Sequence, residues 1–117
     1  MAGFSVSTRQ SGGVTIVDVR GRFTLMEGQA LHDLLADLFQ DGRRKVLLNF
    51  AGVAYLDSSG IGQIVRALYT ARRQDAELKI VEFSPHVREV LKLTHLHDML
   101  SDYPDEAGAL RSFSNDN

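Results

Sequence analysis

Cysteine and tryptophan are absent from these 117 residues, and proline occurs only twice. Without cysteine the protein can have no disulfide, no thiol nucleophile and no Cys-based zinc site. The net charge of -2 is small, and acidic and basic residues are mixed along the chain, which argues against direct binding of nucleic acid. No apolar run has the length of a membrane span, and the start Met-Ala-Gly-Phe-Ser does not resemble a signal peptide. We therefore expect a cytoplasmic protein that binds neither nucleic acid nor membrane.

The residues that are present fit a single folded domain. Hydrophobic residues make up 44% and charged residues 24% of the chain, values typical of soluble globular proteins. A chain of 117 residues can bury one substantial core, but it is small for an enzyme that encloses a deep pocket. Neither a linker nor an internal repeat interrupts it. We predict one domain over residues 1–117.

Hydrophobic periodicity predicts alternating strands and helices. The almost continuous apolar run Val46–Phe50 is typical of a central strand that is buried on both faces. Two strands precede a helix, and the order strand-strand-helix-strand-helix-strand-helix indicates parallel crossovers. We predict an α/β fold with a mixed central sheet of about four or five strands and about four helices. The strands are expected near residues 4–7, 14–19, 46–50 and 78–83, the helices near 27–40, 58–74, 85–93 and 105–113, with a short piece near 99–100.

The segment Leu56-Asp57-Ser58-Ser59-Gly60-Ile61-Gly62 lies where the central strand passes into the second helix. If Asp57 is the N-cap, Leu56 just before it and Ile61 four residues after it form a hydrophobic staple. The Ser58 hydroxyl then stays free at the surface. If Ser58 is the cap, its hydroxyl is partly engaged. The staple favours Asp57. The two glycines leave the first turn bare, so another protein can approach its backbone.

By physics alone, this segment can be no more than a well-capped helix start. However, Tyr55–Gly62, preceded by Val46–Phe50, resembles the signature of STAS-domain anti-sigma factor antagonists. The likeness extends over nearly the whole chain. Val19–Gly21, Leu78–Val81 and Pro85–Leu96 follow in the order and spacing that this family uses.

The resemblance implies a STAS fold and a phosphorylation switch in bacterial partner switching. The unphosphorylated protein binds an anti-sigma factor that is also a serine kinase and so frees a sigma factor; phosphorylation of the serine after the aspartate, here Ser58, releases the partner. A serine phosphatase would reverse the modification. We expect the protein alone to be a monomer. The environment of the phosphosite and the partner-binding surface are expected to comprise Asp57, Ser59, Gly60, Ile61, Gly62, Thr24, Gln63 and Arg66.

One position departs from the family pattern. Many members show Gly-x-Leu-Asp after the second strand, whereas this chain has Gly21-Arg22-Phe23-Thr24. The common acidic residue is therefore replaced by Thr24, close to the expected phosphosite. The Thr24 hydroxyl can substitute for it in part, or the kinase differs from the best-known type.

Two other polar groups are candidate sites. Arg43-Arg44-Lys45 and Arg72-Arg73 can form a basic patch for an acidic partner, but solvated helix ends explain them as well. His95-Leu96-His97-Asp98 suggests a metal site, yet it lacks His-x-x-x-His spacing and a complete set of ligands. We expect neither a metal nor another cofactor.

Two alternative functions remain open at this stage. Ser58 as a hydrolytic nucleophile would need a base and an oxyanion hole. However, the turn is not Gly-x-Ser-x-Gly, and no sequence motif links a histidine to it. We therefore do not expect an enzyme. A STAS domain that serves as a non-switching scaffold, in a transporter-associated or larger signalling complex, is the nearer alternative.

Overall fold

The computed structural model describes residues 3–93, 103 and 105–113. Its strands form a four-stranded sheet in the order β1-β2-β3-β4. β1 is antiparallel to β2, and β2, β3 and β4 are parallel, which confirms the predicted mixed sheet. The elements are β1 (Ser5–Ser11), β2 (Val14–Phe23), α1 (Leu25–Gln40), β3 (Lys45–Leu56), α2 (Ser58–Arg73), β4 (Glu77–Val81), α3 (Pro85–Leu93) and α4 (Glu106–Arg111).

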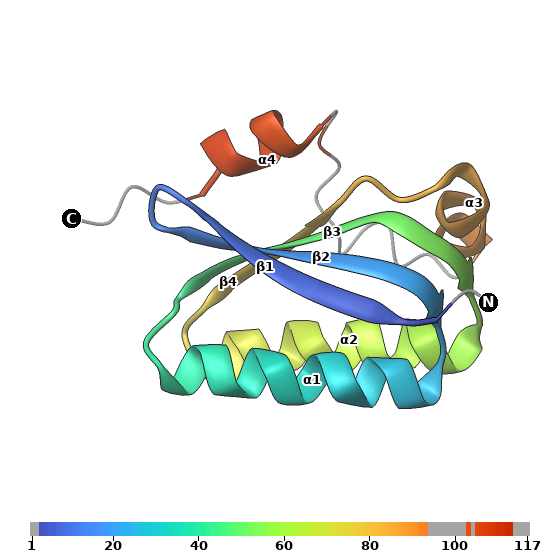
Figure 1. Ribbon diagram of the computed structural model, residues 1–117, viewed down its shortest axis with the longest axis horizontal. Coiled ribbons are helices and arrows are strands. Elements are labelled where there is room, and N and C mark those ends of the chain that lie inside the picture. The colour runs from blue at the N-terminus through green and yellow to red at the C-terminus, as the bar shows by residue number, and fades with distance from the viewer. Residues whose placement is uncertain (1–2, 94–102, 104, 114–117) are drawn as a thin grey trace.

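The sheet lies between two layers of unequal size. α1 connects β2 to β3 and α2 connects β3 to β4, so both helices cover the same face, as two successive right-handed crossovers in one direction require. The short helix α4 covers part of the opposite face (Figure 1). None of the helices in the described part of the chain is both long and apolar enough to span a membrane.

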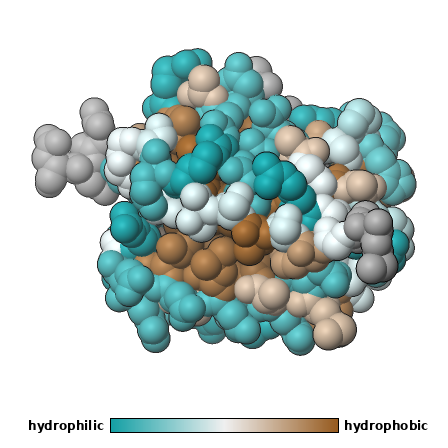
Figure 2. Space-filling model, in the orientation of Figure 1, coloured by the Kyte–Doolittle hydropathy of each residue, from teal (hydrophilic) through white to brown (hydrophobic). Residues whose placement is uncertain are grey.

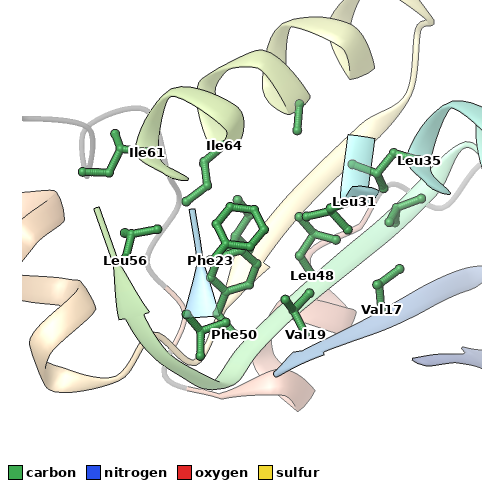
Figure 3. Packing of buried hydrophobic residues seen from close by; sticks show 14 of the residues in the cluster. Val17, Val19, Phe23, Leu31, Leu35, Leu48, Phe50, Leu56, Ile61 and Ile64 are labelled. Atoms are coloured by element: carbon green, nitrogen blue, oxygen red, sulfur yellow. The ribbon is translucent and has the colours of Figure 1, made fainter. Parts of the chain in front are cut away.

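The main core fills the space between the sheet and the pair α1 and α2. Phe23 at the end of β2 and Phe50 in β3 are fully buried there, with ring centroids 5.2 Å apart (Figure 3). A smaller core lies under α4, where Ala109 and Phe113 contact apolar side chains of the other sheet face. Two separate apolar layers explain why β3 is buried on both faces over residues 46–50.

Several element boundaries differ from the sequence prediction. β3 continues beyond residue 50 to Leu56, because β2 also continues, to Phe23, and the two strands stay paired across two irregularities in their register. α1 begins at Leu25 rather than near residue 27, because Thr24 caps it. β1 extends to Ser11, β4 covers only residues 77–81, and α4 ends at Arg111. The helix predicted over 85–93 is confirmed, whereas the short piece near 99–100 lies outside the described residues.

Candidate functional site

The candidate site is the first turn of α2, which Asp57 caps. The Asp57 carboxylate accepts a hydrogen bond from the Gly60 N–H at 2.9 Å, and the Ile61 N–H donates to the Asp57 carbonyl oxygen at 3.0 Å. Asp57 is therefore the N-cap, as the staple indicated, and Ser58 is the first residue of the helix. The staple residues Leu56 and Ile61 are buried at the same end of the main core (Figure 3).

Ser58 and Ser59 are both exposed on this turn. Within the described part of the chain, neither hydroxyl takes part in a hydrogen bond, because Asp57 fulfils the capping role. Ser58 therefore presents an unengaged hydroxyl at a helix N-terminus, where backbone N–H groups and the helix dipole favour added negative charge. The site is chemically suited to accept a phosphoryl group.

The two glycines of the turn have different environments. A Cβ on Gly60 would lie 2.1 Å from the Phe23 carbonyl oxygen and 2.8 Å from Leu56 Cδ1, so the helix backbone rests directly on the end of β2. A Cβ on Gly62 would have no neighbour within 4 Å. The expectation that both glycines leave the turn bare is thus wrong for Gly60, whose open side faces the protein interior. Ile61 is also buried, and both residues support the turn from beneath.

Thr24 is brought to the same edge of the sheet as the serines. Phe23 pairs with Leu56 at the carboxyl ends of two parallel strands, so α1 and α2 begin side by side. The Glu27 carboxylate accepts hydrogen bonds from the N–H of Thr24, at 2.9 Å, and from its hydroxyl. These bonds, above all that from the hydroxyl, lower the pKa of Glu27. Thr24 therefore occupies the helix cap that an aspartate can also fill.

Gln63 is half-buried on the side of α2 that faces α1. A Cβ on Gly28 would lie 2.3 Å from the Gln63 Cβ, which shows how closely the first turns of α1 and α2 pack. Arg66 is exposed, and its guanidinium donates to the Gln63 side-chain oxygen at 3.5 Å. Asp57 to Gln63 and Thr24 thus lie together around the first turns of the two helices, whereas Arg66 lies about 12 Å along α2 from Ser58.

Sequence reasoning missed several residues at this edge. Leu25 and Met26, the first residues of α1, are 46% and 75% exposed and lie next to each other. The Arg22 guanidinium lies 4.3 Å from the centre of the Tyr55 ring, a cation–π contact between paired positions of β2 and β3. The Thr-x-x-Glu capping box was visible in the sequence and would have placed Leu25 and Met26 at the helix start.

The basic residues at the end of α2 lie away from the Ser58 turn. The Arg44 guanidinium donates to the Gln74 carbonyl oxygen at 2.7 Å, so Arg44 lies near Arg72 and Arg73, at the end of α2 opposite Ser58. The Arg43 guanidinium instead donates to the Gln10 side-chain oxygen of β1 at 3.4 Å. The favoured interpretation of these residues as solvated helix ends stays a prediction. The histidine-rich segment 95–98 lies outside the described residues, and the described ones contain no group of three potential metal ligands.

Comparison with known proteins identifies the fold and its relatives. A family model of the STAS domain matches residues 5–109. The anti-sigma-B factor antagonist of Staphylococcus aureus is 31% identical over 84 residues, which cover 72% of this chain and 78% of the relative. An anti-sigma factor antagonist from Mycobacterium paratuberculosis has a similar crystal structure, with a TM-score of 0.81 at 20% identity over 94% of this chain and 93% of that one. The Bacillus cell fate determinant SpoIIAA in its phosphorylated form gives a TM-score of 0.68 at 16% identity, over 95% and 100% of the two chains.

These relatives are regulatory binding proteins, not enzymes. His32 Nε2 lies 3.0 Å from the Thr70 hydroxyl, twelve positions along α2 from Ser58. The family match spans all four strands and most of the helical residues. This chain therefore belongs to the STAS domain family.

Proposed function

We propose that this protein is an anti-sigma factor antagonist whose binding to an anti-sigma factor is released by phosphorylation of Ser58. The observation that carries the proposal is the exposed, unengaged Ser58 hydroxyl at a helix start that Asp57 already caps. The relationship to the S. aureus antagonist supports the type of partner. In this scheme the anti-sigma factor is also the serine kinase, a serine phosphatase restores the binding form, and the events take place in the cytoplasm.

The apolar residues beside Ser58 support a protein partner. Leu25 and Met26 present exposed side chains at the neighbouring helix start, and Gly62 leaves the α2 backbone accessible. An interface centred on this edge would bury Met26 and enclose Ser58 at the same time. A phosphate on Ser58 would then lie inside the interface, where its charge must be desolvated.

Electrostatics gives the switch a sufficient magnitude. Phosphorylation adds a charge of about -1.5 to -2. At an effective dielectric constant of ~20 and a separation of ~5 Å, each unit of like charge costs about 3 kcal/mol before screening by salt, and Asp57 is the adjacent carboxylate. The helix dipole returns up to ~2 kcal/mol, so the domain itself stays folded. Because repulsion within the chain acts in the free protein as well, the affinity falls through desolvation of the phosphate at the interface. A cost of about 3 kcal/mol there would weaken binding by roughly a hundredfold.

The test compares wild-type protein with Ser58→Ala, Ser58→Asp and the matched control Ser59→Ala. Proteins are captured from the native organism, the anti-sigma factor is identified by mass spectrometry, and its affinity for each variant is measured by calorimetry. We expect wild type, Ser58→Ala and Ser59→Ala to bind, and Ser58→Asp to bind much more weakly. Phosphate is expected on Ser58 in wild type and in Ser59→Ala.

Other outcomes would assign another role. If both Ser58 variants bind with wild-type affinity, the protein is a non-switching scaffold. If phosphate is found on Ser59 instead, the acceptor is misassigned although the switch stands.

A further inference from the structure

The outer edge of β1 is open to another strand. β1 pairs with β2 over Ser5–Ser11 without a break in register, and within residues 3–93, 103 and 105–113 no strand lies on its other side. Natural edge strands are usually protected by proline, lysine or a bulge. β1 contains no proline and no lysine. Its one charged residue, Arg9, is bound to Asp18 and Glu106 at 2.7 and 2.6 Å.

An apolar stripe lies directly beneath this edge. The His32–Thr70 contact shows which side of α1 faces α2. At 100° per residue, Leu34 and Leu38 lie about 160° and 120° around the helix from His32, so they point away from α2 and toward the β1 side. Both are only partly buried, as is Val6 of β1, and all three pack on the main core. Figure 2 shows this stripe as a brown band between hydrophilic surfaces, on the face where β1 and α1 lie toward the viewer.

The far border of the stripe is acidic. α1 contains Glu27, Asp33 and Asp37 but no lysine or arginine. Asp33 and Asp37 are exposed, lie one turn apart, and form no ion pair with any of the described residues. By the same helical geometry, Asp37 is about 60° and Asp33 about 100° from Leu34, both on the side away from the core. The surface thus combines an open strand edge, an apolar stripe and an acidic border.

These charges decide between possible occupants. If two copies paired through β1 about a two-fold axis, their α1 helices would lie side by side beneath a continuous sheet. Asp33 and Asp37 of one copy would then approach the same residues of the other, and like charges at an interface disfavour association. A segment that carries basic side chains is attracted by the same carboxylates.

We propose that the β1 edge binds an extended basic segment of a partner protein, which adds a strand to the sheet. Backbone hydrogen bonds to β1 would hold the segment, alternate apolar side chains would cover Val6, Leu34 and Leu38, and lysine or arginine side chains would reach Asp33 and Asp37. Leu34 lies about 14 Å along α1 from Leu25. The edge is therefore separate from the Ser58 turn, and both surfaces can be occupied at once.

The proposal is tested with the full chain and synthetic peptides, by following backbone amide signals in NMR titrations. The probe is a short blocked peptide of alternating lysine and valine. Its controls are the same peptide with glutamate in place of lysine, and one with a proline at its centre. We expect the lysine peptide to bind with a Kd below about 1 mM and to shift amides of residues 5–11 and 30–38, whereas the two controls do not bind.

A second experiment reverses the charges on α1 and measures the effect on peptide binding. The double variant Asp33→Lys/Asp37→Lys changes only exposed side chains and is expected to weaken binding of the lysine peptide by about tenfold or more. Glu89→Lys, an exposed position on α3, is the matched control and should bind as wild type does. Equal binding of the glutamate peptide, shifts centred on other elements, or no binding at all would overturn the proposal. So would a β1-linked dimer in the absence of peptide, which would assign the edge to a second copy.

Discussion

Replacing Gly60 with alanine is expected to destabilise the fold, although alanine is normally the better residue in a helix. The new Cβ would lie 2.1 Å from the Phe23 carbonyl oxygen. This oxygen belongs to the backbone at the end of β2, which β3 holds in place through the Phe23–Leu56 pair. It cannot rotate away as a flexible side chain could. The first turn of α2 must therefore move, and the Asp57–Gly60 hydrogen bond is strained or lost.

The size of the effect follows from three contributions. Overpacking costs ~1–3 kcal/mol, and loss of the Asp57 cap costs ~1 kcal/mol. The higher helix propensity of alanine returns ~1 kcal/mol. We expect Gly60→Ala to lower the free energy of unfolding by about 2 kcal/mol, which corresponds to a decrease in Tm of roughly 8 °C for a domain of this size.

Gly62→Ala is the matched control, two residues further along the same turn. Its Cβ has no neighbour within 4 Å, so only the propensity gain remains, and the variant should be more stable by up to ~1 kcal/mol. Urea unfolding followed by circular dichroism, at one pH and temperature, measures both variants. If Gly60→Ala were stabilised as much as Gly62→Ala, α2 would not rest on Phe23, and the described position of the Ser58 turn would be wrong.

Three further predictions concern the cap and the titratable groups. Asp57→Ala loses the helix cap and should lower the free energy of unfolding by ~1 kcal/mol in the same urea assay. Hydrogen bonds from Arg9 lower the pKa of Asp18 and of Glu106, so these carboxylates stabilise the fold above their unfolded pKa near 4 and lose that effect as the pH falls through the folded values. Glu106→Gln should therefore cost roughly 1 kcal/mol at pH 7 and almost nothing at pH 2, and an equal cost at both would contradict the ion pair. Burial, more than the nearby arginines, lowers the pKa of His32, so the folded protein favours the neutral ring. The stability of the fold should therefore fall once the pH drops below about 6.5. An NMR titration of the ring should give a midpoint below that value.

Local sequence features predicted much of the fold. The apolar run Val46–Phe50 indicated a central strand because both faces of that strand are buried, one under the helices α1 and α2 and one near α4. The cap at Asp57 could also be predicted, because a helix cap and its staple depend on residues within one turn. Local patterns of this kind need no knowledge of distant neighbours.

Features that depend on distant contacts could not be predicted. The apolar pattern predicts a central strand near residues 46–50, but β3 continues to Leu56 because β2 offers it partners across two irregularities in register. Gly60 and Gly62 look alike in the sequence, and only the packing against β2 distinguishes them. Glu106 binds Arg9 across 97 positions of the chain, a separation at which no sequence pattern operates.

We propose that phosphorylation of Ser58 decides whether this STAS domain holds its anti-sigma factor. The most direct measurement is the affinity of that anti-sigma factor for the unphosphorylated protein and for protein phosphorylated by it with ATP, with the modified residue mapped by mass spectrometry. We predict a single phosphate on Ser58 and a loss of affinity of roughly a hundredfold. Phosphate on Ser58 with unchanged affinity, or an anti-sigma factor that binds but never modifies Ser58, would contradict the account.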